Sequence, residues 1–169
     1  VMLGVRLLPA NDTRFRPRLN QLLADRAADL APTDDRPLKS DEPALRVLLA
    51  LQLDALRDLP PQGVRTHASA ADFPGPVPPS APRITATRTI DLATPGWHSL
   101  GLYAPPGEVI TLDVTAGSLA PAPIHIQIGA HTDDLWHLAA WRRVPDIISR
   151  SRLTTHTTRT ASPFGGLIY

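Results

Sequence analysis

The chain has 169 residues and no cysteine, and its 17 Lys and Arg residues nearly balance its 16 Asp and Glu residues. These numbers exclude disulfide bonds and thiolate metal sites, and a net charge of +1 gives no electrostatic footprint for nucleic acid. Hydrophobic residues make up 43% of the chain, enough for a core. No apolar run approaches the roughly 20 residues of a transmembrane helix.

The first helix is predicted between residues 15 and 30. Its apolar side chains recur at spacings of three and four, as on the buried face of an amphipathic helix. Asp12 or Thr13 is expected to cap its first turn, because short polar side chains accept hydrogen bonds from the free backbone N–H groups there. The alternative for Asn11-Asp12-Thr13 is a glycosylation sequon.

A second helix is predicted between residues 42 and 59, where leucines form a broad apolar stripe that ends before Pro60. Ser40 or Asp41 is expected to cap it. The polar stretch 33–39 joins the two helices into a predicted hairpin, which must dock on other parts because two helices alone bury little surface. Residues 1–60 are therefore expected to form a helical lead-in.

A proline-rich linker is predicted at residues 61–82. Proline accounts for 19 of the 169 residues, about twice its usual share of ~5%, and it concentrates in this segment. Such a composition favours an extended, polyproline-like path over a surface. Phe73 is expected to anchor this path on a neighbouring domain.

An antiparallel β-sandwich of the jelly-roll or galactose-binding-like kind is expected at residues 83–163. Short segments alternate apolar and polar residues, and turns such as Pro106-Gly107 separate them about every ten residues. The expected strands cover residues 84–92, 97–103, 110–115, 124–128, 147–153 and 155–161, with a Trp-rich insertion at 135–143 that is expected to hold one helical turn. The predicted fold class is α+β overall, mainly β with a helical N-terminal segment.

Motifs of common enzyme classes are absent from this sequence. It contains no His-Glu-x-x-His zinc motif, no glycine-rich phosphate loop and no Gly-x-Ser-x-Gly nucleophile elbow. His125, His131 and His137 are six residues apart, but a strand followed by a loop gives no reason for their nitrogen atoms to converge on one ion. No catalytic residue and no metal site are therefore predicted, and His131 and Asp133 are expected to bond loop backbone groups.

Aromatic and basic residues cluster in the second half of the chain. Tryptophan rings stack on sugar faces, so an exposed Trp97 or Trp136 would favour glycan binding. The alternative is that the rings fill the core or its rim with their polar atoms paired. The rings concerned are Trp97, Tyr103, Trp136 and Trp141. A basic patch at Arg142, Arg143, Arg150 and Arg152 is explained more simply as a solvated face paired with aspartates than as an anion site.

Four sequence blocks carry a resemblance to a known family. In order, they are Gly96–Ser99 with Gly101–Thr111, then Ile128–Trp136, then Arg143-x-Pro145-x-Ile147, and finally Ser162–Tyr169. These blocks resemble the opening of the enhancin-like metallopeptidase family, bacterial and viral zinc proteases that degrade mucins. Residues 39–73 show a weaker similarity to the helical segment of some bacterial members. Leu100 departs from the small hydroxyl residue that is frequent there.

The resemblance implies a role for a longer protein of which this chain is expected to be a fragment. Family members carry a β-sandwich followed by a peptidase domain, whose His-Glu-x-x-His helix lies downstream of Ser162–Tyr169. Zinc is expected in that domain, where it would polarise the scissile carbonyl and activate a water molecule. The resemblance further implies mucin-type glycoprotein substrates and an extracellular or cell-surface bacterial protein, in which this chain contacts its own peptidase domain.

Residues 164–169 are expected to be the first strand of the peptidase domain, with an exposed edge. Gly165-Gly166 would let another backbone, such as that of a substrate, pass close because neither residue has a Cβ; the alternative is a hinge. Substrate contacts are predicted at Phe164, Gly165, Gly166, His131, Asp133 and Trp136. Two other functions stay open, a glycan-binding module and a non-catalytic interaction or scaffold domain, as in animal relatives that associate with ion channels.

Overall fold

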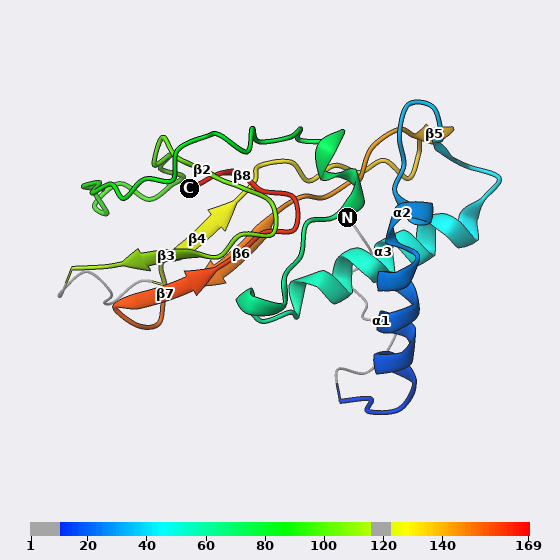
Figure 1. Ribbon diagram of the computed structural model, residues 1–169, viewed down its shortest axis with the longest axis horizontal. Coiled ribbons are helices and arrows are strands. Elements are labelled where there is room, and N and C mark those ends of the chain that lie inside the picture. Colours follow the sequence, from blue (N-terminus) through cyan, green and yellow to red (C-terminus); the bar gives the residue numbers. More distant parts are fainter. Residues whose placement is uncertain (1–10, 116–122) are drawn as a thin grey trace.

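The computed structural model describes residues 11–115 and 123–169 of the chain (Figure 1). Helices gather at one end together with the strand pair of residues 38–39 and 140–141, and the other short antiparallel pairs occupy the opposite end. The predicted α+β class and antiparallel pairing are confirmed, whereas a jelly-roll sandwich is not seen among the pairs of the described residues. No helix in this part of the chain is long and apolar enough to cross a membrane.

Helices α1 (Phe15–Asp25) and α2 (Ala27–Leu30) occupy the segment where one helix is predicted. They are separated at Arg26, whose ψ of 13° departs from the helical value. Asp12 caps α1 as predicted, since its carboxylate accepts hydrogen bonds of 2.9 to 3.1 Å from the backbone N–H groups of residues 14–16. These backbone hydrogen bonds lower the pKa of the Asp12 carboxyl, because they favour its charged form.

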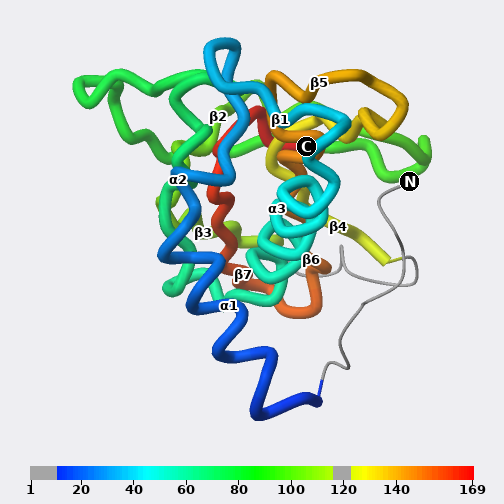
Figure 2. The backbone as a smooth tube through the Cα atoms, turned by 90° about the vertical axis from the view of Figure 1, so that its right-hand side faces the viewer, coloured from blue at the N-terminus to red at the C-terminus, as the bar shows by residue number. Residues whose placement is uncertain are grey.

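Helix α3 (Pro43–Arg57) is the second predicted helix. It begins at a proline and is preceded by Glu42, whose carboxylate accepts a 3.1 Å hydrogen bond from the backbone N–H of Lys39. The predicted cap by Ser40 or Asp41 is wrong, because Glu42 occupies the capping position and makes no side-chain bond to the helix. Helices α1 and α3 pack against each other and cross, as the two views show (Figures 1 and 2).

The segment predicted as a linker, residues 61–82, is folded in its first half. It contains two 3-10 turns, η1 (Pro61–Gly63) and η2 (Ala68–Ala71), and the side chains of His67, Ser69 and Ala70 are buried. An extended path is therefore wrong for residues 61–71, because buried polar side chains fix this stretch to the protein. Phe73 packs against the core around the helices, in the anchoring role predicted for it.

The strands form four antiparallel pairs. These are β1 (Leu38–Lys39) with β5 (Ala140–Trp141), β2 (Tyr103–Ala104) with β8 (Gly166–Leu167), β3 (Ile110–Asp113) with β7 (Thr157–Thr160), and β4 (His125–Ile128) with β6 (Ser149–Arg152). Residues 84–92 form no strand, although their alternation predicts one; Ile84 and Leu92 are exposed, so this segment has no apolar layer to cover. The Trp-rich insertion contains one hydrogen-bonded turn, closed by the Leu138 N–H on the Leu135 carbonyl at 3.0 Å, and β5 follows it.

Backbone hydrogen bonds join two of these pairs side by side. The N–H of Leu100 donates to Ile168 at 2.9 Å, and the N–H of Ile168 donates to Leu102 at 3.0 Å. On the other side, Gln127 and Tyr169 exchange bonds of 2.9 and 2.8 Å. The resulting order is β2-β8-β4-β6, with the final residues inside it. The expectation of an exposed edge at residues 164–169 is therefore wrong, because both flanks of residues 166–169 are paired.

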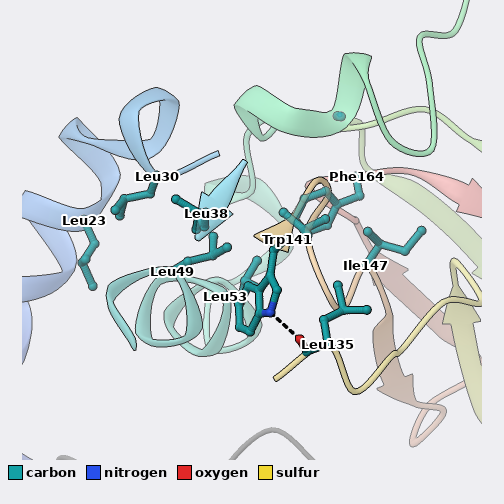
Figure 3. Close-up of a cluster of buried hydrophobic side chains, with 11 residues drawn as sticks. Leu23, Leu30, Leu38, Leu49, Leu53, Leu135, Trp141, Ile147 and Phe164 are labelled. Carbon is teal, nitrogen blue, oxygen red and sulfur yellow. Dashed lines mark hydrogen bonds between the residues drawn. The ribbon is translucent and has the colours of Figure 1, made fainter. Parts of the chain in front are cut away.

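Two hydrophobic cores lie on the two sides of the molecule. The helical core surrounds Trp141, which is fully buried and donates from Nε1 to the carbonyl of Leu135 at 2.6 Å (Figure 3). The sheet core consists of Ala104, Ile126, Ile128 and Ile168, with residues of β3 packed over them. Both cores combine residues that are distant in the sequence.

Arg46 is a buried cation at the junction of α3 and the first strand pair. Only 3% of its surface is exposed, and its guanidinium lies 4.9 Å from the centre of the Trp141 ring. Its Nη2 donates to the carbonyls of Leu38, Leu138 and Ala139 at 3.0 to 3.1 Å. Backbone carbonyls thus compensate the loss of water around this charge, and they tie α3 to both strands.

His67 makes a second junction. Its Nε2 lies 3.2 Å from the Gln52 amide oxygen of α3, its Nδ1 contacts Ser69, and its ring packs 4.8 Å from the ring of Phe164. Its backbone N–H donates to the carbonyl of Pro163 at 2.8 Å. Burial lowers the pKa of the His67 imidazole to about 4, because the charged form loses its hydration. A neutral imidazole therefore links α3 to the segment that enters β8.

Candidate binding surface

Three of the predicted substrate contacts lie inside the protein. Phe164 belongs to the helical core. A Cβ at Gly165 would lie 2.6 Å from the carbonyl oxygen of Ala104, and a Cβ at Gly166 would lie 2.7 Å from the Cα of Gly129. The backbone that passes close to the glycine pair is thus the protein's own, from the strands beside β8. A substrate contact at these residues stays a prediction.

His131 and Asp133 lie in the loop that follows β4. The Asp133 carboxylate forms a 2.8 Å ion pair with Arg143, whose guanidinium lies 4.8 Å from the centre of the Phe73 ring. The exposed His131 ring lies 5.1 Å from the same phenyl ring. The Asp134 carboxylate accepts a bond from the backbone N–H of Trp136. The prediction that polar side chains of residues 131–134 bond loop backbone groups is therefore confirmed for Asp134 and not for His131 or Asp133, which contact other side chains.

Trp136 is half-buried and packs edge-to-face on Trp141, with ring centres 4.8 Å apart. Its Nε1 is buried and has no hydrogen-bond partner within residues 11–115 and 123–169. These two of the four rings therefore fill the helical core, which is the alternative that the sequence leaves open. Of the predicted substrate contacts, Trp136 and Phe164 thus belong to the same core. The structure does not bring them together with His131 and the glycine pair in one open cleft.

The other two rings lie on the outside of the β2-β8-β4-β6 assembly. Trp97 is 59% exposed and Tyr103 is 42% exposed. Tyr103 pairs with Leu167 across β2 and β8, and alternation places Tyr169 on the same side as Leu167. The opposite side carries the sheet core. We call the exposed side the outer face; it comprises Tyr103, Leu167, Tyr169, His125, Gln127, Arg150 and Arg152 on the strands, with Trp97 against them.

Cross-strand pairing arranges the outer face in rows. Tyr169, Gln127 and Arg150 are neighbours in one row, since Gln127 pairs with both other residues. Trp97 lies against this row, with its ring 6.4 Å from the Tyr169 ring and 4.9 Å from the Arg150 guanidinium. His125 and Arg152 face each other in the next row. An aromatic half and a basic half therefore meet at Arg150.

The outer face carries basic side chains and no acidic ones. None of its residues is acidic, and neither Arg150 nor Arg152 takes part in an ion pair among the described residues. The predicted pairing of the basic patch with Asp133, Asp134 and Asp146 is confirmed for Arg143, which pairs with Asp133 at 2.8 Å, whereas Arg142 pairs with Asp34 at 3.5 Å. The basic patch thus divides into a paired half and an unpaired half.

Sequence reasoning did not assign the outer face as a unit. It singles out Trp97, Tyr103 and the arginines, but not Tyr169, Leu167 or Gln127. The period-two pattern of each strand is a usable signal for which residues share a side. The order of the strands is not, because β8 lies between partners more than 35 residues away in sequence. Only the folded register brings these rings and Arg150 together.

Metal ligands do not gather in the described part of the chain. No three His, Asp or Glu side chains among residues 11–115 and 123–169 are arranged so that they could hold an ion. His125 lies on the outer face, whereas His131 contacts Phe73. These residues therefore do not fit a zinc centre.

Comparisons with known proteins agree with this picture of a small α+β unit that presents a surface and carries no catalytic motif. The family model described as the N-terminal domain of M60-like peptidases matches residues 79–169, more than half of the chain. The chain therefore belongs to the M60-like, or enhancin-like, peptidase family, in its N-terminal domain. No solved structure matches it.

Curated relatives from animals match slightly less than half of the chain. "TRPM8 channel-associated factor 1" of Homo sapiens is 36% identical over 87 residues, which are 49% of this chain and 9% of the relative. The Bos taurus protein of the same name is 38% identical over 73 residues, 43% of this chain and 8% of the relative. A "TRPM8 channel-associated factor homolog" of Xenopus laevis is 30% identical over 86 residues, 49% and 9% of the two chains. The matches thus span less than a tenth of these relatives.

Proposed function

We propose that this chain is the non-catalytic N-terminal accessory region of a zinc metallopeptidase that cleaves mucin-type glycoproteins. The observation that carries the proposal is the match of residues 79–169 to the N-terminal domain of M60-like peptidases. The sequence itself lacks the His-Glu-x-x-His motif, so the chemistry belongs to another part of such a protein. The accessory region would brace the peptidase domain and help to place its substrate.

Zinc would be held by the downstream peptidase domain in this proposal. There it would supply a Lewis acid and an activated water molecule. The residues of the present chain would contribute contacts with that domain and with the glycoprotein. A bacterial protein at the cell surface or outside the cell is the setting in which such substrates occur.

Exposed aromatic residues support a second candidate, a glycan-binding module. Trp97 and Tyr103 lie on the outer face, where a sugar ring could stack on them. The two candidates are compatible, because binding the glycans of a glycoprotein is one way to place it for cleavage. The substrate contacts predicted at His131, Asp133 and the glycine pair would then be secondary to the outer face.

The names of the animal relatives support a third candidate, an interaction or scaffold domain. Those proteins are named for association with the TRPM8 channel, and the similarity covers 49% of this chain. The present chain would in that case act by contact with another protein, without peptidase chemistry.

The coding sequence that follows Tyr169 tests the proposal directly. We expect an in-frame His-Glu-x-x-His motif and a later acidic ligand, and chelator-sensitive cleavage of mucin by the whole protein. A stop codon, or a continuing chain without the motif, would contradict the peptidase role. The binding and interaction candidates would then remain, and glycan-binding assays on the 169-residue chain would separate them.

A further inference from the structure

Arg150 on the outer face is held in place and keeps part of its hydrogen-bonding capacity. Its Nε and Nη2 donate to the amide oxygen of Gln127 at 3.1 and 2.7 Å. The amide nitrogen of Gln127 donates to the carbonyl of Gly129 at 2.9 Å, which fixes the orientation of that amide. The Nη1 of Arg150 donates to no group in the described part of the chain, and two more basic side chains, His125 and Arg152, lie in the next row.

Trp97 is held beside this cation while most of its surface faces solvent. The Arg150 guanidinium contacts the indole ring from one side, and the Tyr169 ring meets it nearly edge-on, at 80°. A ring fixed in this way loses little conformational entropy when a ligand stacks on it. Tyr103, in the aromatic half, adds a phenol whose pKa is raised by partial burial, so its hydroxyl is a neutral donor.

From these contacts, the geometry points to the outer face as a binding site for acidic glycans, with a sugar ring on Trp97 and a carboxylate or sulfate on Arg150. A guanidinium binds such groups through paired N–H donors, and charge-assisted bonds of this kind are among the strongest in proteins. The absence of acidic side chains on the face gives its basic side chains charge complementarity to an anion. This inference rests on the proposed function, since it names the class of glycan that the accessory region would recognise.

A glycan fits this face better than a protein partner does. Protein interfaces concentrate apolar and aromatic residues in a core depleted of charge. Here the most exposed ring is in direct contact with Arg150, and the next row carries His125 and Arg152, whereas Gln127 is buried. Separate rings interleaved with polar and basic groups suit a ligand whose ring faces are apolar and whose edges are polar and charged.

The test is a titration of the 169-residue chain with three small probes: sialyllactose, sulfated lactose and neutral lactose. We expect at least one acidic probe to bind about tenfold more tightly than lactose, since a hydrogen bond to a charged group is worth about that factor. Comparison of the two acidic probes identifies whether carboxylate or sulfate is preferred. Equal affinity for all three probes, or no binding by any of them, would overturn the inference.

Three variants locate the site. Trp97→Ala and Arg150→Gln should each weaken binding of the acidic probe by about tenfold, and Arg150→Gln should leave lactose unaffected. Arg159→Gln is the matched control, because Arg159 is an exposed arginine on β7, outside the outer face. Far-ultraviolet circular dichroism verifies that each variant folds. If Trp97→Ala does not fold, Arg150→Gln alone tests the inference.

Two outcomes of the variant series would overturn the inference. One is loss of binding in Arg159→Gln to the same extent as in Arg150→Gln; the other is equal competition by oligoglutamate, which would indicate a general anion site. Failure of the parent protein to cleave mucin would contradict the proposed peptidase role while leaving probe binding intact. Binding and cleavage are therefore separate readouts of the two proposals.

Discussion

The protein contains two arginine–tryptophan pairs of the same geometry in opposite settings. Arg46 and Arg150 each lie 4.9 Å from the centre of a tryptophan ring, Trp141 and Trp97 respectively. The first pair is buried in the helical core, and its guanidinium donates to several backbone carbonyls. The second pair lies on the outer face, and its guanidinium donates to a single side chain.

The difference shows that a cation–π contact does not define a role by itself. A guanidinium whose donors all meet backbone carbonyls stabilises the fold, and its removal takes one hydrogen bond from each carbonyl, although the Ala139 carbonyl keeps its bond from the N–H of Ser40. A guanidinium with a free donor beside an exposed ring can take a ligand instead. The two pairs should therefore respond oppositely to mutation: the buried pair through stability, and the exposed pair through binding.

Replacement of the two tryptophans should give the largest contrast. Trp141→Ala should lower the free energy of unfolding by about 4 kcal/mol, because it opens a cavity in the helical core and removes a buried hydrogen bond. Trp97→Ala should change it by only about 0.5 kcal/mol, as for an exposed surface residue. Urea denaturation followed by circular dichroism measures both. Comparable losses in the two variants would contradict the assignment of Trp97 to a solvent-facing surface.

Replacement of the two arginines should give a slightly smaller contrast. Arg46→Met should cost about 3 kcal/mol, because the buried bonds to the Leu38 carbonyl and the part-buried bonds to the Leu138 and Ala139 carbonyls are lost. Arg150→Met should cost about 1 kcal/mol, since Arg150 is exposed and its bonds to the buried Gln127 are only part-buried. Differential scanning calorimetry on both variants provides the measurement. If Arg46→Met were neutral, the carbonyl contacts would not be what ties α3 to the strands.

Acid should weaken the helical side of the molecule through His67. The unfolded chain binds a proton at this residue near its ordinary pKa of 6.5, whereas the folded chain does so at about 4. Between these values the unfolded state carries more protons, so stability falls as the pH falls. The full difference is on the order of 3 kcal/mol.

Denaturation at pH 7 and near pH 4 checks this dependence. The control is His67→Gln, which can keep a hydrogen bond to Gln52 but has no titrating group. We expect most of the difference between the two pH values to disappear in that variant. The same loss of stability in both proteins would show that other groups govern the acid response.

The helices could be predicted from the sequence, because a stripe of leucines at spacings of three and four reports a local geometry. Strands β3, β4, β6 and β7 could also be located from the sequence, but the assembly around β8 could not. Its register depends on backbone contacts between Gly166, Ala104 and Gly129, which no local pattern encodes. The alternation at residues 84–92 shows the converse: a strand pattern without an apolar layer to cover forms no strand.

The candidate site divides in the same way. Trp97 and the basic patch could be singled out from the sequence. The exposure of the Trp97 ring and the ion pairing of the arginines could not be predicted. The sequence predicts a substrate contact at the Gly165-Gly166 pair, because glycine lets another backbone approach closely. The structure supplies such a backbone from Ala104 and Gly129, within the protein itself. A glycine pair in the sequence therefore indicates a close backbone approach, but only the fold shows whether the approaching backbone belongs to the protein or to a ligand.

The glycines offer the finest contrast between a buried and an open setting. Gly165 and Gly101 have nearly the same φ, +70° and +65°, but a Cβ would meet the Ala104 carbonyl oxygen at 2.6 Å in the first case and nothing within 4 Å in the second. An alanine at either position bears the left-handed strain of roughly 1 kcal/mol. Gly165→Ala should cost about 2 kcal/mol more than Gly101→Ala, because backbone on both sides of β8 must move. Equal losses of unfolding free energy would mean that the strands beside β8 can move at no cost. The close approach at the glycine pair would then have to be made by the backbone of another molecule.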